Sequence, residues 1–292
     1  MSAFTESTFE IVPVSGNAEE LEFVMEESGP FRNFRIVSHS SRPQRIREAV
    51  VLRLPMPFPP DTPLYAEGFN MLSQYWGTIR QIETTSLSDR GHYRLPVKEG
   101  FFTCYNLIQF FPHGAPVLLA GFTSCRRFSN EIRFHEQTLE FVIDCDGTEL
   151  PPGGSLELEE LFITENGGRE QQLAEFAGRI AFHHPPLRCA GQITGWCSWY
   201  CYGPAVTEQD IERNGAAMKR NLPGFRFVQI DDGYQAHMGD WLLPHANFPN
   251  GVKQLCLKIR EMGLEPAIWV APFIAEADSE LFRNHPDWFV MD

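Results

Sequence analysis

The first part of the chain, up to residue 186, is marked by alternating apolar and polar positions. Residues 21–25, 132–135 and 156–159 each show this period of two. Such alternation is typical of strands that bury one face and expose the other to water. Gly, Pro, Asn and Asp residues separate the runs, as expected for turns between short strands. The pattern predicts an N-terminal β-sandwich domain over residues 1–186, with one helix near its end at residues 171–180.

A different pattern begins after the segment His183-His184-Pro185-Pro186, which we interpret as a linker. Short apolar runs at residues 193–200, 225–230 and 264–270 predict strands, and the last is apolar almost throughout, as in a buried parallel strand. Between these runs, apolar residues recur at helical spacing, which predicts helices that begin near Thr207, Gly251 and Asp278. Asp210 stands three residues after Thr207, where a capping box would place it.

Alternation of strand and helix predicts parallel βα units in the second part of the chain. A dinucleotide-binding fold would need a glycine-rich turn after its first strand, but residues 200–204, Tyr-Cys-Tyr-Gly-Pro, contain one glycine. A (β/α)8 TIM barrel fits better, although such a barrel needs eight units in about 250 residues. We therefore expect a multidomain β plus α/β protein in which residues 187–292 form the first three βα units of the catalytic barrel, so that the chain is a fragment.

The net charge narrows the classes of partner. With 38 acidic and 24 basic residues the formal charge is −14, which disfavours binding to nucleic acid or to anionic lipid. No apolar run is long enough to span a membrane, and the first residues lack the features of a secretion signal. The seven cysteines contain no CxxC pair that would indicate a zinc site. These features predict a cytoplasmic protein with reduced thiols and no metal.

Candidate chemistry gathers where the predicted parallel strands end, which is where such barrels place their functional residues. Asp231 and Asp232 follow the second strand, and five of the six tryptophans lie between Trp196 and Trp288. Indole rings offer a flat surface to the apolar face of a sugar, and carboxylates accept strong hydrogen bonds from its hydroxyls. A tryptophan at a strand end can equally be a core residue, and one aspartate could cap a helix, but the adjacent pair is harder to explain structurally.

The adjacent carboxylates Asp231 and Asp232 are predicted to bind a sugar rather than cleave it. Glycosidases place two carboxyl groups on opposite sides of the scissile bond, about 5 Å apart or more. Neighbouring residues at one strand end approach a sugar from the same side. The pair can therefore hold adjacent hydroxyls but cannot flank the anomeric carbon.

Four segments of the second part resemble the α-galactosidases of glycoside hydrolase family 36, the melibiases. They are Gly195-Trp196-Cys197-Ser198-Trp199-Tyr200, Val228-Gln229-Ile230-Asp231-Asp232-Gly233-Tyr234-Gln235, Gly239-Asp240-Trp241-Leu242 with Phe248-Pro249-Asn250-Gly251, and Ile268-Trp269-Val270-Ala271-Pro272-Phe273. Each segment alone would be weak, but their order and spacing together are specific. The first part of the chain resembles the β-sandwich domain of that family only by its length and pattern.

The resemblance implies a retaining hydrolase that releases terminal α-linked galactose from oligosaccharides without a metal or cofactor. Asp231 and Asp232 would bind galactose hydroxyls, and Trp199 and Trp269 would line the same pocket. Further candidates for the pocket wall or its support are Trp241, Asp240, Trp196 and, from the sandwich domain, Trp76 or Phe69. For the last two, simple packing within the sandwich is the favoured explanation. The family's nucleophile and acid/base would lie beyond residue 292, so this chain alone is expected to be inactive.

Two other functions remain open at this point. A raffinose- or stachyose-synthase-like α-galactosyltransferase would share the fold and the galactose site, and nothing in three strands distinguishes its acceptor from water. The chain could instead be a truncated, non-catalytic carbohydrate-binding protein. The resemblance is also compatible with assembly into a homo-oligomer.

Overall fold

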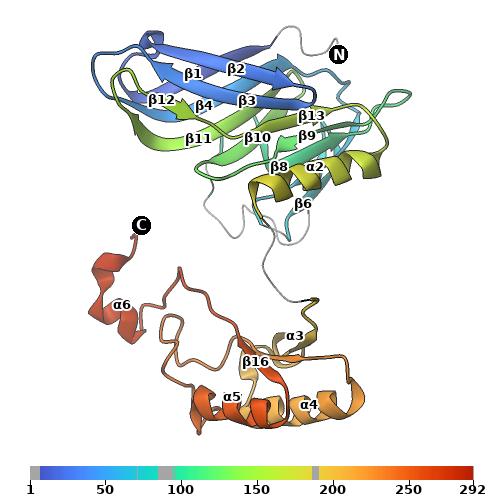
Figure 1. Ribbon diagram of the computed structural model, residues 1–292, viewed down its shortest axis with the longest axis vertical. Coiled ribbons are helices and arrows are strands. Elements are labelled where there is room, and N and C mark those ends of the chain that lie inside the picture. Colours follow the sequence, from blue (N-terminus) through green and yellow to red (C-terminus); the bar gives the residue numbers. More distant parts are fainter. Residues whose placement is uncertain (1–6, 71, 85–94, 96, 186–190, 292) are drawn as a thin grey trace. The chain divides into compact units, whose positions relative to one another are not determined.

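The chain divides into two compact units, residues 1–186 and 187–292. The computed structural model describes residues 7–70, 72–84, 95, 97–185 and 191–291 (Figure 1). The first unit is almost entirely β-structure, whereas the second alternates strands and helices. Among the described residues, none of the helices has the length and apolar character needed to cross a bilayer.

Thirteen strands of the first unit join in one antiparallel hydrogen-bonded network. The main path runs β1-β4-β11-β10-β8-β9-β13-β3-β12, while β2, β5, β6 and β7 pair beside it. The bounds are β1 Thr8–Ser15, β2 Leu21–Ser28, β3 Phe31–Ser38, β4 Gln44–Pro55, β5 Pro63–Glu67, β6 Gln74–Thr78, β7 Ile82–Thr84, β8 Phe102–Phe110, β9 Leu118–Phe122, β10 Ser129–His135, β11 Thr138–Leu150, β12 Ser155–Glu157 and β13 Leu161–Thr164; a short 3-10 helix, η1, covers Ala18–Glu20.

Strand β8 links the two halves of this network. Its first residues pair with β10, and its last residues, from Leu107 to Phe110, pair with β9. Between the two pairings Asn106 has a positive φ of 60°, which breaks the extended backbone. A side chain at Gly121 on β9 would lie 2.5 Å from the Asn106 carbonyl oxygen, so only glycine fits there. The sequence predicted a β-sandwich for this unit. In the structure, β8 pairs with β10 before Asn106 and with β9 after it, so that all thirteen strands belong to one hydrogen-bonded network.

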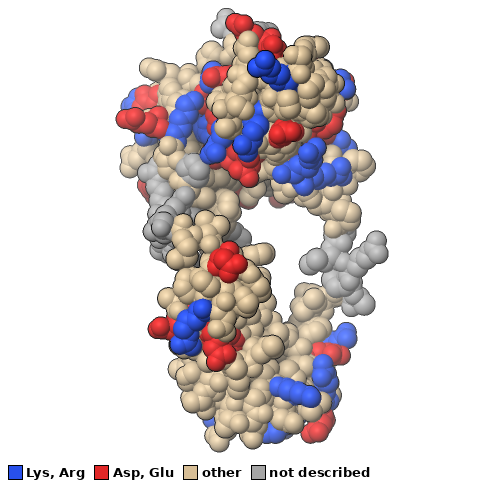
Figure 2. Space-filling view, turned by 90° about the vertical axis from the view of Figure 1, so that its left-hand side faces the viewer, with Lys and Arg blue, Asp and Glu red and all other residues tan. Residues whose placement is uncertain are grey.

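The core of the first unit is built from both halves of the network. Phe141 of β11 lies 6.3 Å, ring centre to ring centre, from Phe122 of β9. On β10, Ile132 and Phe134 are fully buried, as their alternation predicted. Arg133 between them is also buried, at 8% exposure, because it pairs with the carboxylates of Glu131 on the same strand and of Glu48 on β4. Basic and acidic side chains lie next to one another on the face of this unit drawn in Figure 2.

Helix α2, Arg169–His183, lies next to β8 and β9 in Figure 1 and extends beyond the predicted residues 171–180. Phe176 packs on Phe162 of β13 at 5.8 Å. His183, which the sequence placed in a linker, belongs to the last turn of the helix, where its Nε2 lies 2.9 Å from Glu160 Oε1. The linker prediction is therefore wrong at His183, because a buried carboxylate holds that residue in the helix.

The second unit is built on a parallel sheet of order β14-β15-β16, which two helices connect. Apolar residues of both helices and of the strands form its core, with Ile211, Val228, Leu255 and Ile259 fully buried. The helices α4 and α5 lie side by side below the sheet in Figure 1. The bounds are β14 Gly195–Cys197, α3 Trp199–Tyr202, η2 Gly203–Ala205, α4 Glu208–Asn221, β15 Phe227–Ile230, α5 Gly251–Glu261, β16 Glu265–Ile268, α6 Glu280–Asn284 and η3 Pro286–Trp288.

Local sequence signals predicted the start of α4 correctly but extended the first strand of this unit too far. The Thr207 hydroxyl accepts the N–H of Asp210, and the Asp210 carboxylate accepts the N–H of Thr207, so the predicted capping box is confirmed. The first strand was predicted to reach Tyr200, but it ends at Cys197. The Ser198 carbonyl accepts the N–H of Tyr202, which starts a helical turn in place of further strand.

Candidate functional site

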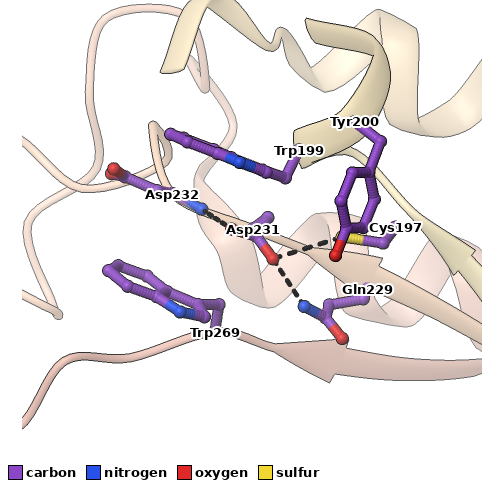
Figure 3. A pocket seen from close by; sticks show the side chains of 7 residues that line it. All are labelled: Cys197, Trp199, Tyr200, Gln229, Asp231, Asp232 and Trp269. Carbon is purple, nitrogen blue, oxygen red and sulfur yellow. Dashed lines mark hydrogen bonds between the residues drawn. The ribbon is translucent and has the colours of Figure 1, made fainter. Parts of the chain in front are cut away.

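A pocket of about 370 Å³ lies where the three parallel strands end. The sequence predicted that Trp199, Asp231, Asp232 and Trp269 would line one pocket, and the structure brings these four residues together there. Figure 3 shows them with three further lining residues, Cys197, Tyr200 and Gln229. The pocket therefore combines aromatic faces with two carboxylates, an amide and a thiol.

The parallel register explains why these side chains meet. Cys197 at the end of β14 is the Cα partner of Gln229 on β15. Asp231 follows Gln229 by two residues and so lies on the same face of the strand. Trp269 follows β16, and its N–H donates to the Ile230 carbonyl at 2.9 Å, which continues the sheet by one residue. The ends of three neighbouring strands thus supply the floor of the pocket.

Asp231 is buried, at 7% exposure, and its carboxylate is held by protein donors. Gln229 Nε2 donates to Oδ2 at 2.5 Å, and the Cys197 thiol donates to the same oxygen at 3.2 Å. The backbone N–H of Asp232 donates to Oδ1 at 2.9 Å. On the backbone side, the N–H of Asp231 donates to Ser198 Oγ at 3.0 Å. Hydrogen bonds within the protein therefore hold both the carboxylate and the backbone N–H of Asp231 before any ligand enters.

Asp232 is less enclosed and is oriented by the turn that follows it. Gln235 Nε2 donates to Asp232 Oδ1 at 2.7 Å, and Gln235 Oε1 accepts the N–H of Gly233 at 3.2 Å. Gly233 has a φ of 114°, and a side chain there would lie 2.5 Å from the carbonyl oxygen of Pro204. The turn thus requires glycine and directs the second carboxylate into the pocket.

Two indole rings flank the acidic pair. In the view of Figure 3 the rings of Trp199 and Trp269 lie on either side of Asp232. Trp199 belongs to α3 and is 43% exposed, so its ring is available to a ligand. The Trp269 ring meets the ring of Trp241 edge to face at 6.0 Å, and the Trp269 carbonyl accepts the Tyr234 hydroxyl at 3.2 Å. Trp241 and Tyr234 therefore support the pocket wall from behind.

Burial and the acidic pair raise the pKa values of two neighbouring side chains, Cys197 and Tyr234. Burial, and the carboxylate of Asp231 beside it, raise the pKa of the Cys197 thiol above its ordinary value. Burial, together with the charge of Asp232, raises the pKa of Tyr234 to about 12. Both groups therefore stay protonated near neutral pH and act as hydrogen-bond donors.

The remaining predicted residues lie elsewhere in their units. Asp240 is buried, and its carboxylate accepts the N–H groups of Glu280 and Leu281 at 2.9 and 3.1 Å, so it holds the start of α6. Trp196 meets Tyr202 edge to face at 6.2 Å and packs on the core of the second unit. Neither is among the described residues that line the pocket.

Trp76, the candidate from the first unit, lies on β6. It is 42% exposed, and its Nε1 donates to Glu83 Oε2 at 2.9 Å. Phe69, the other candidate, meets Tyr105 edge to face at 5.4 Å. Both residues thus have contacts within their own unit, and a role for either in the pocket stays a prediction.

The sequence did not single out Cys197, Tyr200 or Gln229 as lining residues, although all three stand in its quoted motifs. Cys197 and Gln229 are placed by the register between β14 and β15, and Tyr200 by the helical turn of α3; the alternation along one strand reveals neither. Within the part of the chain that the structure describes, no three His, Cys, Asp or Glu side chains form a group that could hold a metal. Six cysteines are free thiols there, and Cys189 lies outside the described residues.

Comparisons of sequence extend the resemblance. Residues 218–292 match the family model described as melibiase. A curated α-galactosidase of Escherichia coli is 39% identical over 118 residues, which is 38% of this chain and 16% of that protein. The α-galactosidase AgaA of Geobacillus stearothermophilus is 36% identical over 72 residues, or 22% of this chain and 10% of that protein. The chain thus matches only a small part of each curated relative.

Comparisons of structure cover nearly the whole chain. The α-galactosidase TtGalA from Thermus thermophilus, in complex with stachyose, matches 93% of this chain with a TM-score of 0.62 and 24% identity. AgaA from Geobacillus stearothermophilus matches 97% with a TM-score of 0.60 and 19% identity. The chain covers 56% and 42% of those two structures, respectively, and these likenesses establish the fold. The family model, the curated relatives and the solved structures agree in the family that this chain resembles, the α-galactosidases of glycoside hydrolase family 36.

Proposed function

We propose that the pocket at the ends of β14, β15 and β16 binds a terminal α-linked galactose, as part of an α-galactosidase that acts on oligosaccharides. One observation carries the proposal: two carboxylates held by protein hydrogen bonds, Asp231 and Asp232, line one pocket with the indole rings of Trp199 and Trp269. Carboxylates accept hydrogen bonds from sugar hydroxyls, and an indole ring packs on the apolar face of a pyranose. The relatives named α-galactosidase and the stachyose complex of TtGalA support this choice of sugar.

The same geometry favours binding over cleavage for the acidic pair. Asp231 and Asp232 are adjacent and are joined by a hydrogen bond from the Asp232 N–H to Asp231 Oδ1. They therefore reach a bound sugar from one side, whereas glycoside hydrolysis needs carboxyl groups on both sides of the bond. The described lining residues contain no further carboxylate. We accordingly expect the nucleophile and the acid/base to come from residues outside this sequence, and residues 1–292 alone to be inactive.

The second unit is proposed to be the beginning of a (β/α)8 barrel. Its three strands are parallel, its connections are helical, and its candidate site lies at the carboxyl ends of the strands, as in such barrels. Ile268 of β16 and Val270 just beyond it are 46% and 45% exposed, although both are apolar. A further strand paired with β16 would cover them.

The proposed function is tested by direct binding of two epimeric sugars to this chain. Methyl α-galactoside and methyl α-glucoside differ only at the C4 hydroxyl, which is axial in the galactoside. Calorimetry or ligand-detected NMR should show saturable binding of the galactoside and weaker binding of the glucoside. Asp231→Asn and Asp232→Asn should each abolish that preference, whereas Asp278→Asn, an exposed carboxylate outside the pocket, should leave it intact. Equal binding of both sugars, or none, would overturn the proposal.

A further inference from the structure

Three polar side chains meet at the end of β14 and β15 in a way that the sugar-binding role alone does not require. Cys197 and Gln229 are directly paired across the parallel strands, and Asp231 stands two residues after Gln229. The period of two places all three on one face of the sheet. Figure 3 shows the thiol and the amide converging on the Asp231 carboxylate.

The two contacts converge on a single oxygen of Asp231. Oδ2 accepts hydrogen bonds from Gln229 Nε2 at 2.5 Å and from the Cys197 thiol at 3.2 Å. A carboxylate oxygen has two lone pairs, so these donors saturate Oδ2. Oδ1 accepts only one hydrogen bond from the described residues, from the N–H of Asp232. Asp231 therefore keeps one acceptor position open, on Oδ1.

The thiol makes this contact as a donor. Burial raises the pKa of Cys197, and the hydrogen bond to Asp231 raises it further. A protonated thiol has one hydrogen to donate, and the Asp231 carboxylate can only accept. The amide of Gln229 likewise presents its NH2 group to the carboxylate, which makes a charge-assisted bond. Each of these two side chains can thus contribute to fixing the plane of the Asp231 carboxyl group.

We propose that Cys197 and Gln229 are positioning residues that saturate Oδ2 of Asp231, so that only Oδ1 is presented to a sugar hydroxyl. The inference rests on the proposed function of the pocket and assigns the selectivity of that pocket to two side chains that need not touch the sugar. With its plane fixed, Asp231 accepts a hydroxyl from one direction, and it discriminates between epimers whose hydroxyls differ in direction. A freely rotating carboxylate would bind either epimer.

Selectivity is the readout that separates positioning from mere structural support. Gln229→Leu should weaken methyl α-galactoside binding about tenfold, because a hydrogen bond to a charged group is lost. Cys197→Ala should weaken it about threefold, since a thiol is a weak donor, and Cys197→Ser should restore it to within about twofold. In Gln229→Leu and Cys197→Ala the ratio of galactoside to glucoside affinity should fall toward one.

Two matched substitutions serve as controls. Cys201 is an exposed thiol four residues after Cys197, and Gln254 is an exposed amide on α5; neither lines the pocket. Cys201→Ala and Gln254→Leu should keep both affinity and selectivity, and thermal unfolding should show that all variants are folded. Wild-type selectivity in Gln229→Leu and Cys197→Ala would overturn the positioning role, even if the wild-type chain binds galactoside as proposed.

A second measurement tests the contact without any sugar. The rate of Cys197 alkylation by iodoacetamide, followed peptide by peptide with mass spectrometry between pH 7 and 10, reports how readily the thiol ionises. Asp231→Asn removes the charge that raises the pKa of Cys197, so the variant should alkylate faster at pH 8, while Cys201 should react at an unchanged rate. Equal Cys197 rates in the two proteins would overturn the contact. Failure of wild-type chain to bind galactoside would instead overturn the proposed function.

Discussion

Glu160, just before β13, offers the sharpest stability prediction of the first unit. Its side chain is only 2% exposed, and Arg179 of α2 pairs with it through both carboxylate oxygens, at 2.7 and 2.6 Å. Thr123 and His183 donate to the same carboxylate at 2.6 and 2.9 Å. The carboxylate thus ties the last turns of α2 to the sheet. Replacing it by an amide of the same shape, Glu160→Gln, removes the charge and leaves the packing.

The contribution of Glu160 to the free energy of unfolding follows from the pKa of its carboxyl group. Burial alone would raise the pKa of Glu160, but the hydrogen bonds from Arg179, Thr123 and His183 lower it from 4.5 to about 2. A pKa that is lower in the folded state adds stability above the unfolded pKa, and this stability is lost as the pH falls through the folded value. The contribution is about 3 kcal/mol at pH 7 and at pH 5, and it falls to about 1 kcal/mol at pH 3.

Hydrogen exchange of the β13 amides, measured for wild type and Glu160→Gln at pH 7, 5 and 3, gives the free energy of opening for this unit. We expect the variant to be less stable by about 3 kcal/mol at the two higher pH values, and the gap to narrow to about 1 kcal/mol at pH 3. Glu157→Gln is the control, because that side chain is 70% exposed and should change stability by less than about 0.5 kcal/mol. A gap that is absent at pH 7, or equally large at pH 3, would show that the ionised Glu160 carboxylate does not stabilise this unit.

Substitutions at three positions test the second unit. Thr207→Ala removes the capping box of α4 and should lower the free energy of unfolding by about 1 kcal/mol in urea titrations, whereas Thr207→Ser should not. Gly233→Ala should cost more than about 2 kcal/mol, read as a lower thermal midpoint, because its φ is positive and a backbone oxygen lies 2.5 Å from the new side chain. Tyr234→Phe removes the donor to the Trp269 carbonyl and should cost about 1 kcal/mol; an unchanged unfolding midpoint would show that this bond adds nothing.

Local sequence signals predicted those features that depend on neighbouring residues. The capping box at Thr207 was visible because a side chain and a backbone group three residues apart complete it. The end of the first parallel strand was misplaced because Ser198 turns the chain into a helix, although the residues that follow are aromatic and read as strand. Similarly, the burial of Arg133 escaped the alternating pattern because its partners, Glu48 and Glu131, include one from a distant strand.

Some lining residues of the candidate site were predicted from the sequence, and others were not. Asp231 and Asp232 were predicted as sugar-binding residues because they follow a strand end, and the family resemblance implied Trp199 and Trp269 as lining residues; the pocket brings the four together. Gln229 and Cys197 were not predicted, because only the register of β14 against β15 places them on the Asp231 carboxylate. That register is set by long-range pairing, which the alternation of one strand does not encode.

A crystal structure of this chain with methyl α-galactoside would show directly whether the pocket holds the sugar. We predict density for one sugar in the pocket, with its apolar face on an indole ring of Trp199 or Trp269. Two hydroxyls should lie about 2.6–3.0 Å from the Asp231 and Asp232 carboxylates, with the axial C4 hydroxyl among them. An empty pocket at saturating sugar, or a sugar bound away from the acidic pair, would contradict the proposed galactose site.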